Sequence, residues 1–477
     1  MTAADTVDTG RIKGALSAKA QRLYYGPPEP AADRAALALI SQVDRAHLVM
    51  LVEQQILPRP QAAQLLRTVC EVAANGFAAV LSRPRPRGLY LAYEQVISER
   101  CGPHLGGMLH TGRSRNDLTA TTTLMALRQQ GLTVLSEGCR LLTALLATAG
   151  RQLDVVMPIH THYQPAMPIT YGYYLTGVAL ALHRELDRIW QTLASLRRCP
   201  LGAHAVAGTN LPLDTTRTAR LLGFQAGPLH AVDAVASRDA ARDALGHAAG
   251  LAVLLSRLAT DLQLWSMTEL GYVEFPDWLV GSSSAMPQKR NAFLLEYLRA
   301  RPAQVVGAWI ANVHATNSAP FTNSIQVGTE AIAPLGPALR TTQDLLGMAA
   351  LLVAGARPRP STSRAGAPSG FLDATALANE LVRGGLPFRQ AHQRIGAAVL
   401  AALDGDGPWP PAGLPELDLR ATVDQARYGG GPGDRAGALA AGWRLRHQLR
   451  RRIARLRRAQ QQAAQRLQAA TEAVTRG

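Results

Sequence analysis

The stretch at residues 281–291, GSSSAMPQKRN, places three serines before a lysine and an asparagine, directly ahead of an apolar run. Small residues at its start allow it to move, whereas Pro287 fixes φ in its middle. Lys289 and Asn291 precede a predicted helix, whose N-terminus offers unpaired N–H groups and a positive dipole end to an anion. Arginine is the usual cation of this chain, since only three of its 50 basic residues are lysine. We therefore expect a carboxylate-binding reaction site here, with a solvated linker as the alternative.

A second stretch, HTGRSRND at residues 110–117, brings two guanidinium groups and three short hydrogen-bonding side chains into one predicted loop. Asp117 is suited to cap the helix that follows. Ser114, Arg115 and Asn116 can together clamp a carboxylate or a phosphate at this loop–helix junction. The alternative is an ordinary helix cap flanked by solvated arginines.

A third stretch, MPIHTHYQPAMP at residues 157–168, carries His160 and His162 between prolines. Two histidines at this spacing could ligate a metal, but no cysteine or acidic residue is near them in sequence, so we predict neither a metal nor a cofactor. We expect a turn between two long helices, a place where a histidine can transfer a proton. His162, with Thr161 beside it, is the candidate, and a structural histidine is the alternative.

Segments poor in proline, with apolar residues at three- and four-residue spacing, predict long helices in the middle of the chain. Five are expected, over residues 118–153, 169–198, 232–270, 292–317 and 329–354. Five long helices with short links favour an all-α antiparallel bundle, and no strand pattern is sustained.

Three domains are expected. A small helical N-terminal domain occupies residues 1–105, the bundle with the three polar stretches occupies 106–356, and a small helical domain with a basic tail occupies 357–477. The N-terminal domain contains three expected helices, at residues 31–57, 60–81 and 89–101. The second boundary is placed at the linker RPRPSTSRAGAPSG, which is rich in proline, serine and glycine.

The composition is that of a globular protein, with 47% hydrophobic and 5% aromatic residues. Four scattered cysteines form no CxxC pair, which argues against a disulfide scaffold and fits a reducing compartment. The first residues lack the pattern of a secretory signal, and the longest uncharged apolar run, residues 345–356, is too short to span a bilayer. We therefore expect a cytoplasmic protein without a membrane partner.

A net charge of +16 raises the question of a nucleic-acid partner. The one dense basic cluster, residues 444–458, would be basic nearly all round on a helix, with a thin apolar stripe at Leu445, Leu449, Ile453 and Leu456. No helix-turn-helix, RNA-recognition or zinc-finger pattern accompanies it. We expect a solvated terminal helix and no nucleic acid, with contact to nucleic acid or a membrane surface as the alternative.

Together the three polar stretches resemble the argininosuccinate lyase family, a branch of the fumarase/aspartase superfamily. The superfamily loop GSSxMPxKxN is matched at Ser283, Ser284, Met286, Pro287, Lys289 and Asn291. Two positions depart from it, with Ser282 in place of Gly and Ala292 in place of Pro. HTGRSRND is typical of the branch, and THYQ at residues 161–164 resembles its THLQ.

The resemblance implies a fumarase/aspartase-like fold in a homotetramer, whose central helices form one bundle and whose active sites combine motifs from three subunits. It also implies that an N-succinyl substrate loses nitrogen to give fumarate. Ser283 is then the base that removes a proton, activated by closure of its loop, and His162, paired with Glu296, is the acid for the leaving nitrogen. The sequence leaves the opposite assignment of Ser283 and His162 open.

The reaction spreads negative charge onto a carboxylate, so fixed donors must meet it. Side chains with suitable charge or hydrogen-bonding capacity are Lys289, Asn291, Ser114, Asn116 and Thr161. Arg115 and Gln326 are further candidates for binding the substrate.

Three segments depart from the family pattern. Its DxxGSxAH element reads ISQVDRAH at residues 40–47, its DxH element reads GLY at 88–90, and its YNKDxQEDKE segment reads FTNSIQVGTE at 321–330. The resemblance assigns the missing Tyr and Lys of the last segment to the arginine half of the substrate. The substrate is therefore argininosuccinate or another N-succinyl amine, guanidine or amidine from a specialised pathway. A catalytically silent homologue is a third hypothesis, which the presence of Ser283, His162, Lys289 and Glu296 disfavours.

Overall fold

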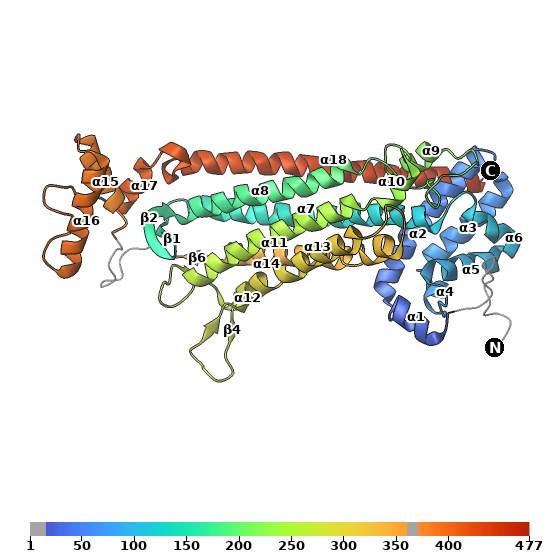
Figure 1. The fold of residues 1–477 in the computed structure, drawn as a ribbon, viewed down its shortest axis with the longest axis horizontal. Helices are drawn as coiled ribbons and strands as arrows, with labels where there is room; N and C mark the ends of the chain where they lie inside the picture. The colour runs from blue at the N-terminus through green and yellow to red at the C-terminus, as the bar shows by residue number, and fades with distance from the viewer. Residues whose placement is uncertain (1–15, 360–370, 477) are drawn as a thin grey trace.

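The computed structural model describes residues 16–359 and 371–476 and is dominated by a long bundle of helices (Figure 1). The bundle helices are α7 (Arg115–Arg151), α8 (Tyr171–Ser195), α11 (Asp239–Trp265), α13 (Pro302–Asn317) and α14 (Leu335–Gly355). α7 packs against both α8 and α14, and the shared core is mainly leucine and alanine. Close approach depends on small residues, since a Cβ at Gly138 of α7 would lie 2.2 Å from the side chain of Leu186. The prediction of an all-α bundle is confirmed.

Three of the expected bundle helices are split in two or begin later than predicted. The segment expected at 232–270 is split into α10 (Ala231–Ala236) and α11. The segment expected at 292–317 is split into α12 (Phe293–Ala300) and α13, which Pro302 begins because proline lacks the N–H that a continuous helix needs. The last bundle helix begins only at Leu335, after a single π-helical turn, η3 (Gln326–Glu330).

The expectation that no strands form is wrong at residues 156–170. Strands β1 (Val156–Thr161) and β2 (Gln164–Thr170) pair antiparallel in a hairpin beyond the end of α7. Both strands of a two-stranded ribbon are edges, so the prolines at 158, 165 and 168 do not prevent pairing. Shorter strands also occur in pairs, namely β3 (Val273–Glu274) with β6 (Arg357–Pro358) and β4 (Gly281–Ser282) with β5 (Arg290–Asn291).

The N-terminal region packs at one end of the bundle around a second core, to which α7, the 199–224 segment and the last helix of the chain also contribute. Its elements are α1 (Ala18–Tyr25), α2 (Pro30–Glu53), α3 (Arg59–Ala74), α4 (Ala78–Leu81), α5 (Leu89–Cys101), α6 (Pro103–Gly106) and the 3-10 turn η1 (Gly107–His110). The helix expected at 60–81 is therefore two helices, because the chain turns through Phe77 in the left-handed region, with φ of 59°.

The C-terminal region ends in a helix of 42 residues, α18 (Arg435–Arg476), which runs back along the bundle (Figure 1). It packs on α7 and α8 and reaches α2 and α3, so its packing differs from that of a tail on a small separate domain. The predicted apolar stripe is confirmed, since Leu449 and Ile453 are buried. The other elements here are α15 (Ala374–Arg383), α16 (Phe388–Asp404), α17 (Leu419–Gln425), η4 (Tyr428–Gly430) and η5 (Pro432–Asp434). The boundaries near residues 105 and 357 remain a prediction.

Two described helices, α2 and α7, are long and apolar enough to cross a bilayer by length and composition. Their most apolar windows are 67% and 56% buried inside the protein. The apolar faces of both helices are therefore used for packing against other helices.

Candidate active site

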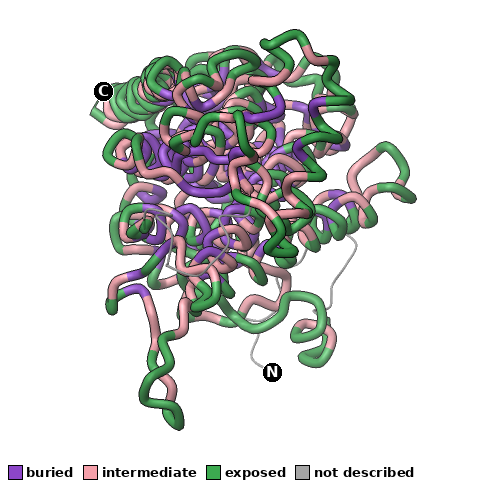
Figure 2. Tube along the Cα trace, turned by 90° about the vertical axis from the view of Figure 1, so that its left-hand side faces the viewer, coloured by how far each residue is buried: buried purple, intermediate pink, exposed green. Residues whose placement is uncertain are grey.

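The serine-rich loop is a projecting hairpin whose base is the β4–β5 pair (Figures 1 and 2). The hydroxyl oxygen of Ser283 accepts hydrogen bonds from the backbone N–H groups of Ala285, at 3.3 Å, and Met286, at 3.1 Å. Hydrogen bonds donated to an oxygen favour its charged form. The loop therefore provides part of the stabilisation that a serine needs to act as a base.

The neighbouring cations of this hairpin have different roles. Arg290 forms an ion pair with Asp277 and donates to the carbonyl of Phe275 at 2.8 Å, which fixes the base of the hairpin. Lys289 is exposed, and its ammonium has no hydrogen bond or ion pair within residues 16–359 and 371–476, although its backbone N–H donates to the carbonyl of Met286. The ammonium of Lys289 is thus available to an anion, and the amide of Asn291 lies at the β4–β5 pair, 3.4 Å from the Ser282 carbonyl.

Thr161 and His162 lie at the tip of the β1–β2 hairpin, and both are exposed. His162 and Tyr163 form its two-residue turn and have positive φ values of 51° and 62°. A two-residue hairpin turn with positive φ at both positions favours Asn-Gly, so His-Tyr here is strained. Strain of this kind is common at functional sites, which makes the hairpin tip the most distinctive feature of this stretch.

Glu296, the predicted partner of His162, is an exposed residue in the first turn of α12. Within the described part of one chain, no ion pair or hydrogen bond joins Glu296 to His162. Their pairing is therefore not formed inside a single protomer.

The 110–117 stretch ends in a reciprocal cap of α7. Asn116 donates its backbone N–H to the Ser114 hydroxyl at 3.3 Å, and Ser114 donates its own N–H to Asp117 at 3.0 Å. The other oxygen of the fully buried Asp117 carboxylate accepts the N–H groups of Gly202, at 3.0 Å, and His204, at 2.9 Å. Asp117 therefore caps the helix, as predicted, and also fixes the 202–205 loop beside it.

The candidate substrate-binding side chains of this stretch differ in their exposure to solvent. Arg115 is exposed, whereas Asn116 is half-buried and donates its amide to the carbonyl of Ala205 at 3.3 Å. Gln326, the remaining candidate, is exposed on η3, whose end is fixed by a hydrogen bond from Asn312 to Ala331 at 2.7 Å.

The sequence did not predict a buried polar cluster behind the 110–117 stretch. Arg113 and Asp44, whose side chains are both 0% exposed, form an ion pair at 2.5 Å. Arg113 also donates to the hydroxyl of Tyr90 at 3.2 Å, and Tyr90 lies 2.9 Å from Nδ1 of His110. Burial alone would lower the pKa of Arg113, but the carboxylate of Asp44 raises it. An acidic residue on the apolar face of the helix expected at 31–57 was the signal that could have revealed this cluster.

The ionisable groups at the edge of this cluster are shifted by burial. Burial, followed by the repulsion of Arg113 and Arg115, lowers the pKa of His110 to about 4. Burial raises the pKa of Glu94, whose carboxylate lies 3.9 Å from Nδ1 of His110. His110 is therefore neutral at pH 7.

One chain does not bring the three polar stretches together. Arg115 begins α7 and the β1–β2 hairpin lies beyond its end, and a helix of 37 residues is about 55 Å long at about 1.5 Å per residue. The Ser283 hairpin projects from another part of the bundle (Figure 1). Within one protomer, predicted site residues that belong to different stretches are therefore not neighbours.

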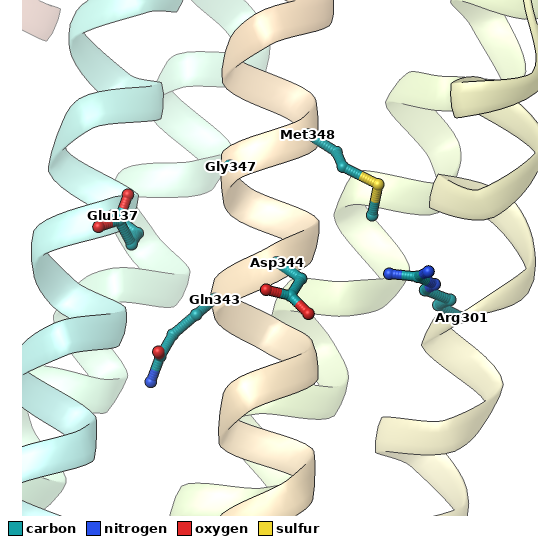
Figure 3. A pocket seen from close by; sticks show the side chains of 6 residues that line it. All are labelled: Glu137, Arg301, Gln343, Asp344, Gly347 and Met348. Atoms are coloured by element: carbon teal, nitrogen blue, oxygen red, sulfur yellow. The ribbon is translucent and has the colours of Figure 1, made fainter.

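A shallow groove of about 460 Å³ lies elsewhere, where side chains from α7, α14 and the α12–α13 junction meet (Figure 3). Its lining residues are Glu137, Arg301, Gln343, Asp344, Gly347 and Met348. None of the predicted catalytic or binding residues is among them, so this groove is not the candidate active site.

Comparison with known proteins agrees with the motifs. A family model described as lyase matches residues 88–307, and one described as argininosuccinate lyase C-terminal matches residues 371–420. The argininosuccinate lyase of Halorhodospira halophila is 34% identical over 419 residues, covering 87% of this chain and 88% of that protein. The corresponding enzyme of Methanothrix thermoacetophila is 36% identical over 385 residues, covering 80% of this chain and 76% of that protein.

A solved structure of an EDDS lyase variant with bound fumarate superposes with a TM-score of 0.84, at 27% identity and over 97% of both chains. A class II fumarase from Schistosoma mansoni, at 17% identity and a TM-score of 0.64, shares the fold. The chain therefore belongs to the argininosuccinate lyase family of the fumarase/aspartase superfamily and is a carbon–nitrogen lyase.

Proposed function

We propose that this lyase cleaves argininosuccinate to arginine and fumarate, in a homotetramer whose active sites are shared between subunits. The observation that carries the proposal is the Ser283 hairpin, where a serine with two backbone N–H donors on its oxygen shares the hairpin with Lys289, whose ammonium has no partner among the described residues. The curated relatives with which the chain shares most of its length are argininosuccinate lyases.

Assembly supplies what one chain lacks. Large apolar side chains are exposed on the bundle helices, including Trp309 and Ile310 on α13 and Leu351 on α14. Burying them against other subunits is favourable by about 25 cal/mol per Å² of apolar surface. The antiparallel packing of bundles from neighbouring subunits would also bring opposite ends of α7 side by side, so that the Arg115 end of one subunit meets the His162 end of another.

In the proposed reaction, Ser283 removes a proton from the carbon beside a succinyl carboxylate. The negative charge that develops is met by Lys289 and Asn291, together with Ser114, Asn116 and Thr161 from other subunits. His162, oriented by Glu296 of another subunit, then protonates the nitrogen as the carbon–nitrogen bond breaks. Gln326 and Arg115 hold the remainder of the substrate.

The alternative substrate is another N-succinyl amine, guanidine or amidine. Two observations favour it, since residues 321–330 keep only Gln326 and Glu330 of the family segment, and the EDDS lyase variant superposes over nearly the whole chain. The residues that meet the succinyl half are present in either case, so the alternative changes the leaving group and not the reaction.

Incubation of the purified protein with argininosuccinate, followed by the ultraviolet absorbance of fumarate, tests the proposal. We expect release of fumarate, and the absence of release from argininosuccinate would rule out that substrate. A panel of N-succinyl amines, amidines and guanidines, with products identified by mass, then tests the alternative. The reverse reaction can be tested by supplying fumarate together with the corresponding amines, amidines and guanidines. If no compound of the panel reacts in either direction, the remaining hypothesis is that the protein is a catalytically silent homologue.

We also propose a cytoplasmic location. The four cysteines are free, as in a reducing compartment. Cell fractionation with antibodies against the protein would test this location.

A further inference from the structure

Four polar side chains from separate segments form a chain of contacts behind the substrate-binding stretch. Asp44 on α2 pairs with Arg113 at 2.5 Å, Arg113 donates to Tyr90 on α5 at 3.2 Å, and Tyr90 lies 2.9 Å from Nδ1 of His110. The ion pair is completely buried, whereas the side chain of His110 is 33% exposed. The contacts therefore lead from the interior to the surface beside Arg115.

The direction of each hydrogen bond follows from the donors available. Arginine has no acceptor, so the oxygen of Tyr90 accepts from Arg113. The single proton of the Tyr90 hydroxyl is then left for Nδ1 of His110, which must be the unprotonated nitrogen of a neutral ring. The ring proton is consequently on Nε2, which has no hydrogen-bond partner among the described residues.

This arrangement is costly in stability. Nε and Nη1 of Arg113 are buried without an acceptor among the described residues, and each such group costs about 1–3 kcal/mol. A buried ion pair can often be replaced by apolar residues without loss of stability. The presence of Asp44 and Arg113 in the interior, despite this cost, therefore indicates a role in positioning.

Two of the segments that depart from the family pattern meet at this point. Asp44 stands where the family pattern has Ser, Tyr90 where it has His, and Gly88 where it has Asp. Gly88 has φ of 93°, and a Cβ on it would lie 3.1 Å from the ring of Tyr25. A side chain at residue 88 would thus be strained, and the carboxylate beside Arg113 comes from α2. The positions at which the two segments differ from the family pattern therefore belong to one cluster of contacting residues.

We propose that Asp44, Arg113 and Tyr90 are positioning residues that fix the orientation and tautomer of His110, whose Nε2–H donates to a carboxylate of the substrate. The proposal rests on the proposed function, because the carboxylate belongs to the N-succinyl compound. Arg115, which begins the adjacent helix and is exposed, supplies the positive charge that a carboxylate needs beside a neutral donor. The carboxylate lies on the succinyl half or on the leaving-group half.

Removal of the Tyr90 hydroxyl has a predictable effect on the ring of His110. The charged and titratable groups that face the ring are Glu94, His47, Arg113, Arg115 and His204. Among the described residues, Glu94, with Oε1 3.9 Å from Nδ1, is then the acceptor beside that nitrogen and draws the ring proton to it. Nε2 then loses its proton and cannot donate to a carboxylate, unless acid protonates both nitrogens.

Steady-state kinetics of Tyr90→Phe between pH 6 and pH 8 test the proposal. At pH 8 we expect KM to rise about 5–10-fold, the value of one lost hydrogen bond, with kcat within about twofold of the wild type. The rise should be the same at pH 6, because the burial and the two arginines that lower the pKa of His110 to about 4 are present in both proteins and keep the ring neutral. His110→Gln, which keeps an amide donor, should retain more affinity than His110→Ala.

Tyr171→Phe is the matched control. Tyr171 is another fully buried tyrosine, on α8, and its hydroxyl has no hydrogen-bond partner among the described residues, so its loss leaves the Asp44–Arg113–Tyr90 contacts in place. An equal rise of KM in both tyrosine variants, or a fall of kcat alone in Tyr90→Phe, would overturn the proposal. Competitive inhibition by fumarate identifies the carboxylate. The inhibition constant rises in Tyr90→Phe if the succinyl half is bound and is unchanged if the leaving-group half is bound.

A measurement without turnover separates this proposal from the proposed function. Diethylpyrocarbonate modifies neutral imidazole, and the extent of modification at His110 can be followed by mass spectrometry of the intact enzyme after digestion. At pH 7 we expect slow modification of His110 in the wild type, because the Tyr90 hydroxyl occupies the unprotonated Nδ1. In Tyr90→Phe the ring proton moves to Nδ1 and the unprotonated Nε2 is free, so modification should be several-fold faster. Equal rates in the two proteins would contradict the relay even if fumarate is released, and the expected difference would support it even if argininosuccinate is not the substrate.

Discussion

The hydroxyl oxygen of Ser283 lies 3.1 Å from the backbone nitrogen of Met286, from which it accepts a hydrogen bond. A second N–H, from Ala285, approaches the same oxygen at 3.3 Å. Both bonds stabilise a negative charge on the serine, and Lys289 follows on the same hairpin with no partner in the described part of the chain. We therefore propose Ser283 as the base and keep His162 as the proposed acid.

Replacement of Ser283 by alanine should lower kcat about 10²–10⁴-fold, the usual contribution of a group that transfers a proton. Ser282→Ala is the matched control, because Ser282 is an exposed serine next to it on the same hairpin. Fumarate release by both variants, together with the mass of the assembly in light scattering, checks the prediction. Equal activities in the two variants would remove Ser283 from the mechanism.

Two substitutions at the tip of the β1–β2 hairpin should have the same effect on backbone strain but different effects on activity. Asn tolerates positive φ, so His162→Asn and Tyr163→Asn should both preserve or stabilise the turn. Only His162→Asn removes the proposed acid, and we expect it to lower kcat about 10²-fold or more while Tyr163→Asn stays close to the wild type. Circular dichroism and thermal unfolding would verify that both fold, and full activity of His162→Asn would show that the acid lies elsewhere.

His47 should make the protein sensitive to acid. It is completely buried with Nε2 2.7 Å from the carbonyl of Thr111, and burial followed by repulsion from Arg113 lowers its pKa to about 3. A lowered pKa in the folded state gives stability that is complete above the unfolded value of 6.5 and is lost as the pH falls towards 3.

Between pH 7.5 and pH 5.0, His47 should therefore cost about 2 kcal/mol per chain, at about 1.4 kcal/mol per pH unit below the unfolded pKa. Denaturant unfolding at both pH values compares the wild type with His47→Gln, which keeps a donor for Thr111 but does not titrate. The variant should lose about 2 kcal/mol less than the wild type over this range. Equal losses would mean that His47 is not the group responsible.

Exposed apolar residues of the bundle should be buried between subunits. Ile310 on α13 is 46% exposed, and Ile310→Asp would place an unpaired carboxylate in the proposed interface, at a cost of several kcal/mol. Light scattering should show dissociation of the tetramer with a parallel loss of activity. Leu403→Asp on α16, where the side chain is 63% exposed and distant from the bundle, should have no effect on assembly. An intact tetramer in Ile310→Asp would exclude α13 from the interface.

The sequence predicted the bundle well because its signals are local and repeated. Leucines at helical spacing in α7 and α8 indicated long buried helices, and Asp117 could be recognised as a cap from its position before an apolar run. Prolines marked the ends of helices but were misread at 156–170, because proline argues against central strands and not against the edges of a two-stranded ribbon.

Contacts between distant segments were not predictable in the same way. Asp44 and Arg113 are far apart in sequence, and nothing local shows that one neutralises the other in the interior. The path of α18 back to α2 and α3 was unpredictable for a similar reason, because a basic helix with a thin apolar stripe can pack on many surfaces. In the proposed tetramer the three stretches would meet only between subunits, and no pattern within a single chain encodes such a meeting.

Mixing of two inactive variants tests the shared active site most directly. Ser283→Ala and His162→Asn subunits would be dissociated together, reassembled at a 1:1 ratio, and assayed for fumarate release. If the two residues act from different subunits, about a quarter of the sites in randomly mixed tetramers regain both, so activity should return to about that fraction of the wild type. If both residues of each site come from one chain, every site lacks one of them, and a mixture as inactive as its parents would contradict the account.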